Sequence, residues 1–365
     1  MSEFKMRHNR IAVLTSGGDC AGLNAAIRAI VYRANHEYGW SVIGIRDGTA
    51  GLLERPIRYK ELNIETLDPT LLMQGGTMLG TVNKGDPFAF PMPDGSEKDR
   101  SGEAVEGFKA LNVDALIGIG GDGSLRILSR LTAQGGIPFV AVPKTIDNDV
   151  ECTDYSIGFN SAVNQAVRAL DALQPTAASH RRVMVLEVMG RDVGWIAVAA
   201  AIAGGADVAL IPEIPFDAAK VGETLRQWFA LGRNHSLVVC AEGVKLMSGD
   251  RVAHIFADGQ VRYGGVGAAI ADLISKETGA EARVTVLGHV QRGGSPTALD
   301  RIMASALGAH AVDLLANGKT NRVAVWQNGE PSDVPLEDVA GKTRALSPNH
   351  PLVRTARQLG ICFGD

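Results

Sequence analysis

Short apolar segments alternate with helical patterns along this chain of 365 residues, and the alternation limits the folds it can adopt. Runs rich in β-branched residues predict strands at 11–14, 41–45, 115–119, 139–142, 183–188, 208–211, 237–240, 284–287 and 323–326. Helical periodicity separates most of them and predicts helices at 21–34, 161–173, 218–231, 267–277 and 300–317. Continuous apolar strands that alternate with helices are typical of parallel sheets covered on both faces. The sequence therefore predicts an α/β fold with mainly parallel sheets.

Composition and charge exclude several classes of protein. Hydrophobic residues make up 45% and charged residues 21% of the chain, which is typical of a soluble globular protein, and 365 residues suit two domains. The net charge of -4 indicates no basic surface for nucleic acid. No apolar run reaches membrane-spanning length, and residues 1–10 lack the apolar core of a signal peptide, so we expect a cytoplasmic protein. The cysteines Cys20, Cys152, Cys240 and Cys362 lie far apart, which indicates neither a zinc site nor a disulfide framework.

A glycine-rich turn follows the expected strand at 115–119. Gly120, Gly121, Asp122, Gly123 and Ser124 lead directly into a helical pattern. Glycines let the backbone approach an anion and direct N–H groups at it, and a helix start adds partial positive charge. The carboxylate can hold a hard cation such as Mg²⁺ beside a phosphate. The segment predicts a polyphosphate site, whereas an ordinary strand-to-helix turn is the alternative.

A second glycine turn has the same form. Ser16, Gly17 and Gly18 leave the strand at 11–14, and Asn24 lies in the first turns of the following helix. Such a start is common in α/β proteins and is weak on its own. Two such turns in one chain predict one ligand held from two sides.

Other polar clusters also lie at the ends of expected strands. Residues 142–149 bring together Lys144, Thr145, Asp147 and Asp149, although an Asx turn would also explain the acidic residues. Two further turns follow strands. One carries Arg191, which could instead be a solvated surface arginine. The other, at 288–296, carries His289 and Arg292 before a Gly-Gly pair, which favours a phosphate or sugar ligand. A lone histidine is more often a packed residue than a ligand contact.

Arg181 and Arg182 begin the strand at 183–188, whereas Arg191 follows its end. If Arg182 binds a ligand at the cleft, it must do so from a neighbouring subunit. Phosphoryl transfer needs a turn that binds the donor phosphates, a carboxylate that holds a metal, a second carboxylate that acts as base, and positive charge. This chain has candidate residues for each part, with several arginines for the positive charge. Because arginine binds phosphate through two parallel hydrogen bonds, the surplus arginines predict an acceptor that itself carries a phosphate.

Five motifs in this order resemble those of the A-type 6-phosphofructokinases. They are Thr15-Ser-Gly-Gly-Asp19 with Gly22 and Asn24, Gly120-Gly-Asp-Gly-Ser124, Thr145-Ile-Asp-Asn-Asp149, Met189-Gly-Arg191 and Gly288-His-Val-Gln-Arg-Gly-Gly-Ser-Pro296. The Gly-Gly-Asp-Gly-Ser motif is the least specific, since lipid kinases and NAD kinases carry a similar one. The resemblance runs from about residue 11 to residue 326.

The resemblance implies transfer of a phosphoryl group from Mg-ATP to the 1-hydroxyl of fructose 6-phosphate, as in glycolysis, with Mg²⁺ as cofactor. It implies two doubly wound, Rossmann-like domains with the active site in the cleft between them. Residues 1–157 with 291–341 would bind the nucleotide, and residues 158–290 with 342–365 would bind the sugar phosphate. It also implies a homo-oligomer, usually a tetramer with active sites shared between subunits.

The resemblance assigns roles to individual residues. Asp147 would be the base, acting with Thr145 and Arg191, and Asp122 would bind Mg²⁺. Donor contacts would come from Gly18, Gly121, Asp122, Gly123, Ser124, Asn83 and Lys84. Acceptor contacts would come from Thr145, Asp147, Arg182, Met189, Gly190, Arg191, Glu242, Arg283, His289 and Arg292, with Arg182 and Arg283 supplied by a neighbouring subunit.

Two departures from the family pattern concern the donor, and a third is the region from about 244 to 265, which is longer than in compact bacterial members. Many ATP-using members have an arginine after Gly-Thr-x-Leu-Gly, where this chain has Thr81-Val-Asn83 followed by Lys84. Pyrophosphate-using members resemble one another in an aspartate at the position of Gly123 and a lysine at the position of Lys144. Gly123 favours ATP and Lys144 favours pyrophosphate, so the pyrophosphate-dependent phosphotransferase is the alternative. The stretches at 84–103 and 243–265 predict loops or hairpins that either cover a site or are surface insertions.

Two interpretations from other classes compete with the kinase. Gly118, Gly120 and Gly123 fit a dinucleotide-binding fingerprint, as in an NAD(P)-dependent oxidoreductase. That fingerprint requires an acidic residue about 20 positions later, where this chain has Pro143 and Lys144. A catalytically inactive regulatory subunit is the other alternative, although both catalytic carboxylates are present.

Overall fold

The computed structural model describes residues 6–82, 85–246, 253–255 and 261–365. The chain divides into two compact units. Unit 1 comprises Met1–Asn160 and Arg292–Thr343, and unit 2 comprises Ser161–Gln291 and Arg344–Asp365. The nucleotide and sugar-phosphate roles expected for the two parts of the chain stay predictions.

Unit 1 is built on a mainly parallel sheet with the strand order β16-β15-β7-β6-β1-β2-β3. Its strands are β1 (Arg10–Thr15), β2 (Ser41–Ile45), β3 (Tyr59–Leu62), β6 (Ala115–Gly120), β7 (Phe139–Thr145), β15 (Arg322–Gln327) and β16 (Glu330–Pro335), and the short β8 (Ile157–Gly158) pairs with β7. Only the edge strands β3 and β16 run antiparallel to their neighbours. The central strands are buried on both faces, as the continuous apolar runs predict.

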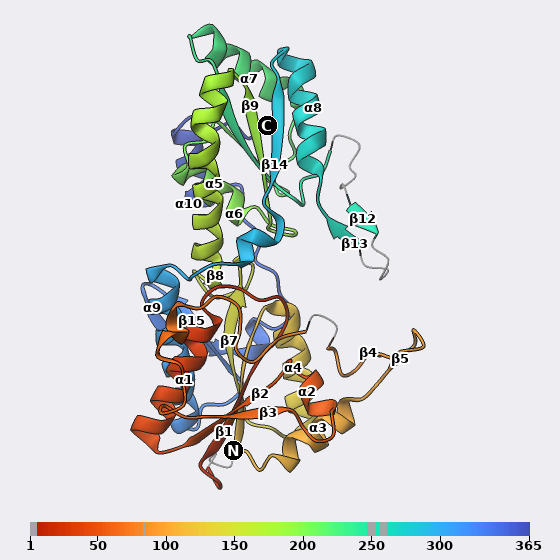
Figure 1. The fold of residues 1–365 in the computed structure, drawn as a ribbon, viewed down its shortest axis with the longest axis vertical. Helices are drawn as coiled ribbons and strands as arrows, with labels where there is room; N and C mark the ends of the chain where they lie inside the picture. The colour runs from red at the N-terminus through yellow and green to blue at the C-terminus, as the bar shows by residue number, and fades with distance from the viewer. Residues whose placement is uncertain (1–5, 83–84, 247–252, 256–260) are drawn as a thin grey trace. The chain divides into compact units, whose positions relative to one another are not determined.

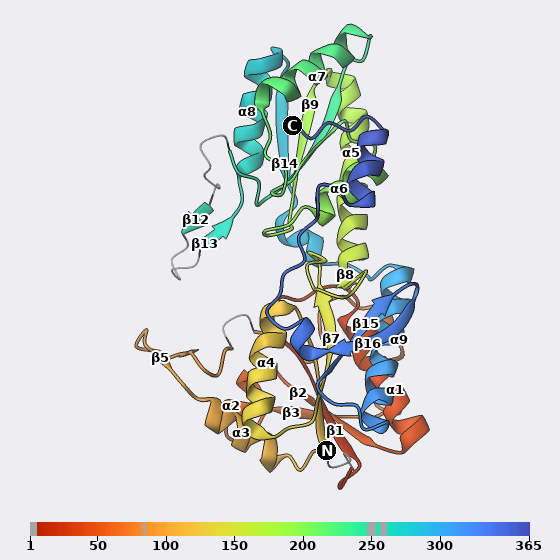
Figure 2. The ribbon, with the colours of Figure 1, turned by 180° about the vertical axis from the view of Figure 1, so that it is seen from behind.

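Helices cover both faces of this sheet (Figures 1 and 2). One face carries α1 (Leu23–Tyr38) and α9 (Ala298–Ala316), which pack on each other. The other carries α2 (Ala50–Leu53), α3 (Ser101–Ala110) and α4 (Asp122–Gly135). Between these helices and the sheet lies a core that includes Leu14, Leu116, Leu128 and Phe139, all at most 1% exposed. The 3-10 turns η1 (Pro69–Met73) and η3 (Leu336–Asp338) complete the unit.

Unit 2 has a smaller, fully parallel sheet with the order β10-β11-β9-β14. The strands are β9 (Val183–Val188), β10 (Val208–Leu210), β11 (Ser236–Ala241) and β14 (Ala282–Val286). The helices are α5 (Phe159–His180, beginning at the end of unit 1), α6 (Trp195–Ala203), α7 (Ala218–Ala230), α8 (Val266–Thr278) and α10 (Pro351–Gln358), with the 3-10 turn η2 (Gly288–Arg292) after β14. Figures 1 and 2 show α5 and α8 on opposite sides of this sheet. The predicted α/β fold with mainly parallel sheets is confirmed.

The helix expected at 161–173 is longer than predicted. It runs through Pro175 to His180. A proline inside a helix removes one backbone hydrogen bond and usually ends the helix, which is why the sequence pattern predicts a stop there. Leu170 and Ala177, one on each side of the proline, are both fully buried. Burial of the helix therefore outweighs the local preference.

Both polar stretches contain a hairpin. The first holds β4 (Phe90–Pro91) and β5 (Glu97–Lys98), and the second holds β12 (Ala253–Ile255) and β13 (Val261–Tyr263). The first stretch ends in a helix, because α3 already begins at Ser101, so the predicted loop is wrong at its last residues.

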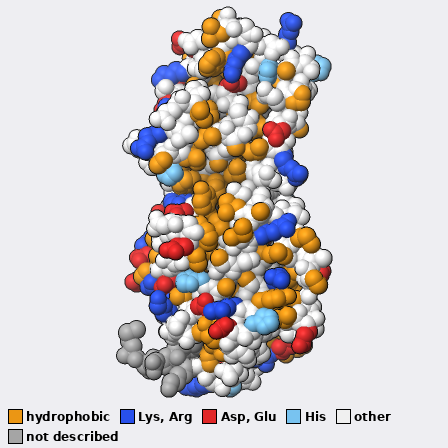
Figure 3. All heavy atoms as spheres, turned by 90° about the vertical axis from the view of Figure 1, so that its left-hand side faces the viewer, with side chains coloured by type: hydrophobic (Ala, Val, Ile, Leu, Met, Phe, Trp, Pro, Cys, Tyr) orange, Lys and Arg blue, Asp and Glu red, His pale blue; other side chains and the backbone are white. Residues whose placement is uncertain are grey.

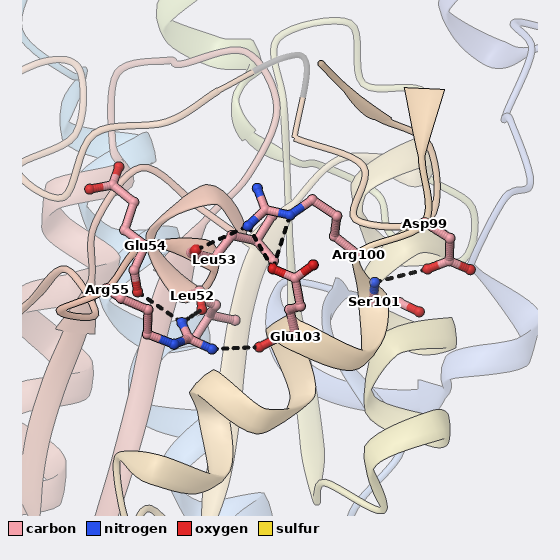
Figure 4. Close-up of polar contacts among 8 residues, drawn as sticks. All are labelled: Leu52, Leu53, Glu54, Arg55, Asp99, Arg100, Ser101 and Glu103. Carbon is pink, nitrogen blue, oxygen red and sulfur yellow. Dashed lines mark hydrogen bonds and ion pairs between the residues drawn. The ribbon is translucent and has the colours of Figure 1, made fainter. Parts of the chain in front are cut away.

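A polar network holds the end of the first stretch against α2 (Figure 4). Arg100 donates to the Leu53 carbonyl at 3.3 Å and to the Glu103 carboxylate at 2.7 Å. Arg55 donates to the carbonyls of Leu52 and Glu103 at 2.7 and 3.1 Å. These bonds satisfy carbonyl groups at the C-terminal end of α2, and so they join α2 to the start of α3.

Both sheets have a position where the strand order reverses. In unit 1 the chain passes from β1 to β2 on one side and then returns to β6 on the other side of β1. In unit 2 the corresponding reversal lies between β9 and β14. Open α/β sheets bind ligands at the carboxyl ends of the strands beside such reversals. In the described part of the chain, no helix combines the length and apolar character needed to cross a membrane.

Candidate active site

The two glycine turns of unit 1 lie side by side, because β1 and β6 are neighbours in the sheet. The Ser16 N–H donates to the Ile119 carbonyl at 2.9 Å, which ties the start of one turn to the end of the other strand. Gly17 has a φ of 80°, and a Cβ atom there would lie 2.8 Å from Ser124 Oγ. Only glycine allows both that backbone conformation and that close approach.

The start of α4 offers backbone donors. Its N-cap residue is Gly121, and no side chain caps the first turn. The first N–H groups of a helix have no partner within the helix, so an anion can bind there. The space beside Gly123 is open: apart from its chain neighbours and the backbone of its own helix, no atom of the described residues lies within 4 Å of the place where its Cβ would be. The predicted donor residues Gly121, Asp122 and Ser124 lie on the same turn.

Arg292 lies on the first glycine turn, although its motif predicts an acceptor contact. Its Nη1 atom donates to the Asp19 carbonyl at 3.1 Å. A Cβ atom on Gly18 would lie 2.3 Å from the same nitrogen, so the guanidinium covers this glycine. In this structure Arg292 therefore contacts the expected donor turn, and the assignment of Arg292 to the acceptor stays a prediction.

Asn24 and Thr81 hold a second segment against the same turn. The Asn24 amide donates to the carbonyls of Gln74 and Gly75, both at 3.2 Å, and its oxygen accepts from the Met78 N–H at 2.7 Å. Thr81 Oγ1 donates to the Gly17 carbonyl at 2.6 Å. At Thr81, where the chain begins to depart from the family pattern, it is therefore bound to the first glycine turn. Asn83 and Lys84, both predicted donor contacts, lie outside the described residues.

The third turn of unit 1 carries the predicted base. Thr145 ends β7, next to β6, and Thr145 Oγ1 accepts from the Asp147 N–H at 3.1 Å. Asp147 is 9% exposed. Asp122 begins α4, and its Oδ2 atom accepts from Thr343 Oγ1 at 3.4 Å. The carboxylates predicted as base and metal ligand therefore follow adjacent strands, at the same edge of the sheet.

Asp149 belongs with these carboxylates, although its motif alone allowed an Asx turn. It is 6% exposed, and its Oδ1 atom is buried without a hydrogen-bond partner. Burial, with the charges of Asp147 and Asp122, raises its pKa to about 7. Asn148 does shape the turn, because its side chain accepts from the Ser156 N–H at 2.9 Å. The signal for Asp149 in the sequence is its spacing of two residues from Asp147.

These carboxylates fit a metal bound together with a phosphate. Among the described residues, no three His, Cys, Asp or Glu side chains lie close enough to hold a metal ion by themselves. Mg²⁺ typically takes one or two protein carboxylates and completes its shell with substrate phosphates and water. The partly exposed Asp122 and the buried, unpartnered Asp149 oxygen are compatible with that ligand set.

In unit 2, the turn after β9 is held by two side chains. The Arg191 N–H donates to Glu242 Oε1 at 3.0 Å, and Glu242 directly follows β11. The Met189 N–H donates to Gln291 Oε1 at 2.6 Å. Gln291 is 2% exposed and was not predicted as a site residue, although it lies inside the His-Val-Gln-Arg motif. The structure thus brings together Met189, Gly190, Arg191 and Glu242 and leaves the Arg191 side chain exposed.

His289 and the remaining arginines lie at opposite ends of this sheet. His289 is exposed in η2, after the end of β14. Arg182 precedes β9, and Arg283 pairs with Met184 near the other end of β14. The six residues of β9 span about 20 Å at roughly 3.3 Å per residue, so Arg182 and Arg191 cannot hold one phosphate within this unit.

Glu281 holds both of these arginines. Arg182 Nε donates to Glu281 Oε2 at 2.8 Å, and Arg283 Nη2 pairs with Glu281 Oε1. The arginine pair lowers the pKa of Glu281, with the Arg182 hydrogen bond as the largest cause. Arg182 and Arg283 therefore lie beside the same carboxylate, and their common role toward the sugar phosphate stays a prediction.

Comparison with known proteins supports one family. The family model described as phosphofructokinase matches residues 10–315. "ATP-dependent 6-phosphofructokinase 1" of Synechocystis sp. is 54% identical over 365 residues, covering 100% of both chains. The protein of the same name from Nostoc sp. is 54% identical over 359 residues, covering 98% of this chain and 99% of its own.

Solved structures show the same fold. The phosphofructokinase of Pichia pastoris in the T-state has a TM-score of 0.79 and 30% identity; the match covers 91% of this chain and 35% of the yeast chain. A pyrophosphate-dependent phosphofructokinase from Marinobacter aquaeolei has a TM-score of 0.77 and 23% identity, covering 98% of this chain and 92% of its own. The family match covers most of the chain and the curated relatives align over nearly its whole length, so the chain belongs to the phosphofructokinase family.

Proposed function

We propose that this enzyme phosphorylates fructose 6-phosphate at the 1-hydroxyl with ATP, giving fructose 1,6-bisphosphate and ADP, a reaction of glycolysis. The names of relatives that are 54% identical over the full length support ATP as donor. The single structural observation that carries the proposal is the open space beside Gly123 at the start of α4. An aspartate there would crowd and repel the α-phosphate of a nucleotide, whereas glycine leaves room for it.

The donor half of the site consists of the turns after β1 and β6. The N–H groups of Gly18 and of Gly121 to Ser124 would hold the phosphates, and Asp122 would hold Mg²⁺ together with phosphate oxygens. When bound, Mg²⁺ would shield the charge of the transferred group.

Asp147 is the base in this proposal. The 1-hydroxyl oxygen forms its bond to the γ-phosphorus, the bond from that phosphorus to the β–γ bridging oxygen breaks, and the Asp147 carboxylate takes the hydroxyl proton. Thr145 positions Asp147 through the backbone hydrogen bond at 3.1 Å. Met189, Gly190, Arg191, Glu242 and His289 would bind the sugar, together with Arg292.

The acceptor site also requires a second copy of the chain. Arg182 and Arg283 lie at the far end of β9 and β14 from Arg191, so they would bind the sugar 6-phosphate of a neighbouring subunit. The edge strand β14 supports such a contact, because Val284 and Val286 are 38% and 52% exposed. Figure 3 shows further hydrophobic side chains at the surface on the side where α1 and α9 lie in Figure 1. A tetramer and a cytoplasmic location stay predictions.

The donor comparison tests this function. We expect kcat/KM at saturating fructose 6-phosphate and Mg²⁺ to be far higher with ATP than with pyrophosphate, and Gly123→Asp to lower ATP use much more than any pyrophosphate use. Equal or greater efficiency with pyrophosphate would favour the alternative phosphotransferase. No turnover with either donor would favour an inactive regulatory subunit. A nicotinamide absorbance in the purified protein would favour the oxidoreductase, an interpretation that the family match contradicts.

A further inference from the structure

Gln291 is a buried amide in the 3-10 turn η2, between His289 and Arg292 in the chain. It is 2% exposed, and its amide has a partner at each end. The Oε1 atom accepts from the Met189 N–H at 2.6 Å, and the Nε2 atom donates to the Ala162 carbonyl on α5 at 3.4 Å. An amide group is costly to bury unless its donor and acceptor atoms are paired, and these two bonds meet that requirement.

The bond to Met189 links two segments of unit 2 beyond the strands that precede them. β9 and β14 are neighbours in the sheet, and after their paired residues the Leu287 N–H donates to the Glu187 carbonyl at 3.1 Å. The chain then continues into η2 after β14 and into residues 189–194 after β9. Both segments carry predicted sugar contacts, so the Gln291 side chain joins two parts of the expected acceptor site.

The acceptor turn, as we call residues 189–194, has a backbone that depends on its surroundings. Gly190 has a φ of 149° and Arg191 a φ of 52°, and a non-glycine residue stays in the left-handed region only where neighbouring groups hold it. Side chains from elsewhere in unit 2 bind N–H groups of this turn: Gln291 at Met189, Glu242 at Arg191 and Glu213 at Gly194. Of these, Gln291 alone is uncharged, so it holds the turn without adding negative charge beside the predicted contacts of an anionic sugar phosphate.

We propose that Gln291 is a positioning residue for the acceptor: its side chain fixes the acceptor turn relative to η2, so that the sugar contacts of both segments act on one molecule. The inference rests on the proposed function and deepens it. Gln291 acts through Met189 and not on the substrate, because its amide is buried and engaged at both ends. A misplacement of about 1 Å can lower a rate on the order of a hundredfold, so such a link affects the reaction without touching it.

Three variants test the role of Gln291. Gln291→Met keeps the length of the side chain and removes both hydrogen bonds, whereas Gln291→Glu keeps an acceptor for Met189. Gln227→Met is the matched control, because it removes the 3.4 Å bond of an exposed glutamine to Glu223 on α7. We expect Gln291→Met to raise the KM for fructose 6-phosphate about tenfold, while the KM for ATP stays within about twofold. Gln291→Glu should recover part of the loss, and Gln227→Met should match the unaltered enzyme.

Amide hydrogen exchange gives a second measurement that does not depend on turnover. The Met189 N–H should exchange faster in Gln291→Met than in the unaltered enzyme and in Gln227→Met, while the amides of β9 keep their protection. Unchanged exchange at Met189 would overturn the inference.

The kinetic results separate this inference from the proposed function. An unaltered enzyme that does not phosphorylate fructose 6-phosphate would overturn both. An active unaltered enzyme whose Gln291→Met variant keeps the KM for fructose 6-phosphate within about twofold would overturn this inference alone. So would an equal rise in the KM values of both substrates, or failure of Gln291→Met to fold, because the side chain would then serve general stability and not the acceptor.

Discussion

Asp147 and Asp149 are two residues apart in one turn, and both carboxylates are buried. Asp147 is buried, at 9% exposure, and its backbone N–H donates to Thr145 Oγ1. Asp149 is buried to a similar degree, at 6% exposure, and burial raises its pKa to about 7. The assignment of the base to Asp147 rests on its place in the Thr145-Ile-Asp-Asn-Asp149 motif and stays a prediction.

Replacement of Asp147 by asparagine tests its role as base. The amide cannot accept the 1-hydroxyl proton, so we expect Asp147→Asn to lower kcat by ~10²–10⁴-fold with little change in either KM. Steady-state kinetics with ATP and fructose 6-phosphate measure this effect. Asp171→Asn, on the exposed face of α5, is the matched control. A kcat within a few-fold of the unaltered enzyme would contradict the assignment.

The raised pKa of Asp149 predicts how the stability of the protein depends on pH. Its pKa rises from 3.8 to about 7 on folding, so between these values the folded protein keeps a proton that the unfolded chain has lost. The free energy of unfolding of the ligand-free protein should therefore fall as the pH rises through this window. Asp149→Asn removes this titration. The melting temperature of the variant should therefore rise relative to that of the unaltered protein as the pH increases from 4 to 7. Parallel melting curves for the two proteins, or an equal gain in the exposed control Asp272→Asn, would count against it.

At the scale of elements, the start of α8 depends on a carboxylate from the adjacent strand. Glu187, on β9, is 2% exposed and accepts from the N–H groups of Gly265 and Gly267 at 2.9 and 2.7 Å. A Cβ atom on Gly267 would lie 3.0 Å from Glu187 Oε2, so glycine allows this contact. A carboxylate at a helix N-terminus satisfies free donors and interacts favourably with the helix dipole.

Glu187→Gln should destabilise unit 2. An amide group places its own N–H₂ against one of the two backbone donors, which leaves that donor buried and unpaired. We expect a loss of about 2 kcal/mol in the free energy of unfolding, measured by denaturant titration. Glu223→Gln, an exposed change on α7, should leave it unaltered. If both variants unfold at the same denaturant concentration, α8 does not depend on this carboxylate.

At the scale of the whole molecule, the proposed role of the arginines at the far end of β9 and β14 depends on assembly of two or more chains. Arg182 and Arg283 share Glu281 in one cationic site. That site lies about 20 Å from Arg191, the length of a six-residue strand. A single acceptor can therefore use both groups only if they come from two copies of the chain.

Arg182→Ala and Arg283→Ala should each raise the KM for fructose 6-phosphate about tenfold or more, because each removes a charge-assisted bond to the sugar phosphate. The KM for ATP should barely change. Arg226→Ala is the control, since Arg226 on α7 also contacts a glutamate, through the Glu277 carbonyl. Equal effects on both substrates, or an active enzyme that sediments as a monomer, would contradict a shared acceptor site.

The local pattern of apolar and polar residues was sufficient to predict the strands of both sheets and the turns that carry the candidate site residues. The strands at 41–45 and 183–188 match β2 and β9 residue for residue, because each is an apolar run with clear ends. The turns containing Gly18, Asp122 and Asp147 were also predictable, because glycines and acids directly after such strands come together at one edge of a parallel sheet. The sequence by itself thus determined the fold class and the edge of each sheet at which the candidate site residues lie.

Only the tertiary structure decided how the side chains of the site are used. Lys144 binds Gly18 across 126 positions, Asn24 holds Met78 across 54, and Glu187 holds Gly267 across 80. Burial of its side chains lets α5 continue through Pro175, and, separately, burial of Asp149 raises the pKa of that carboxyl. Pairings between distant segments, and the loss of water around a charge, depend on how elements pack, and a local pattern of residues records neither.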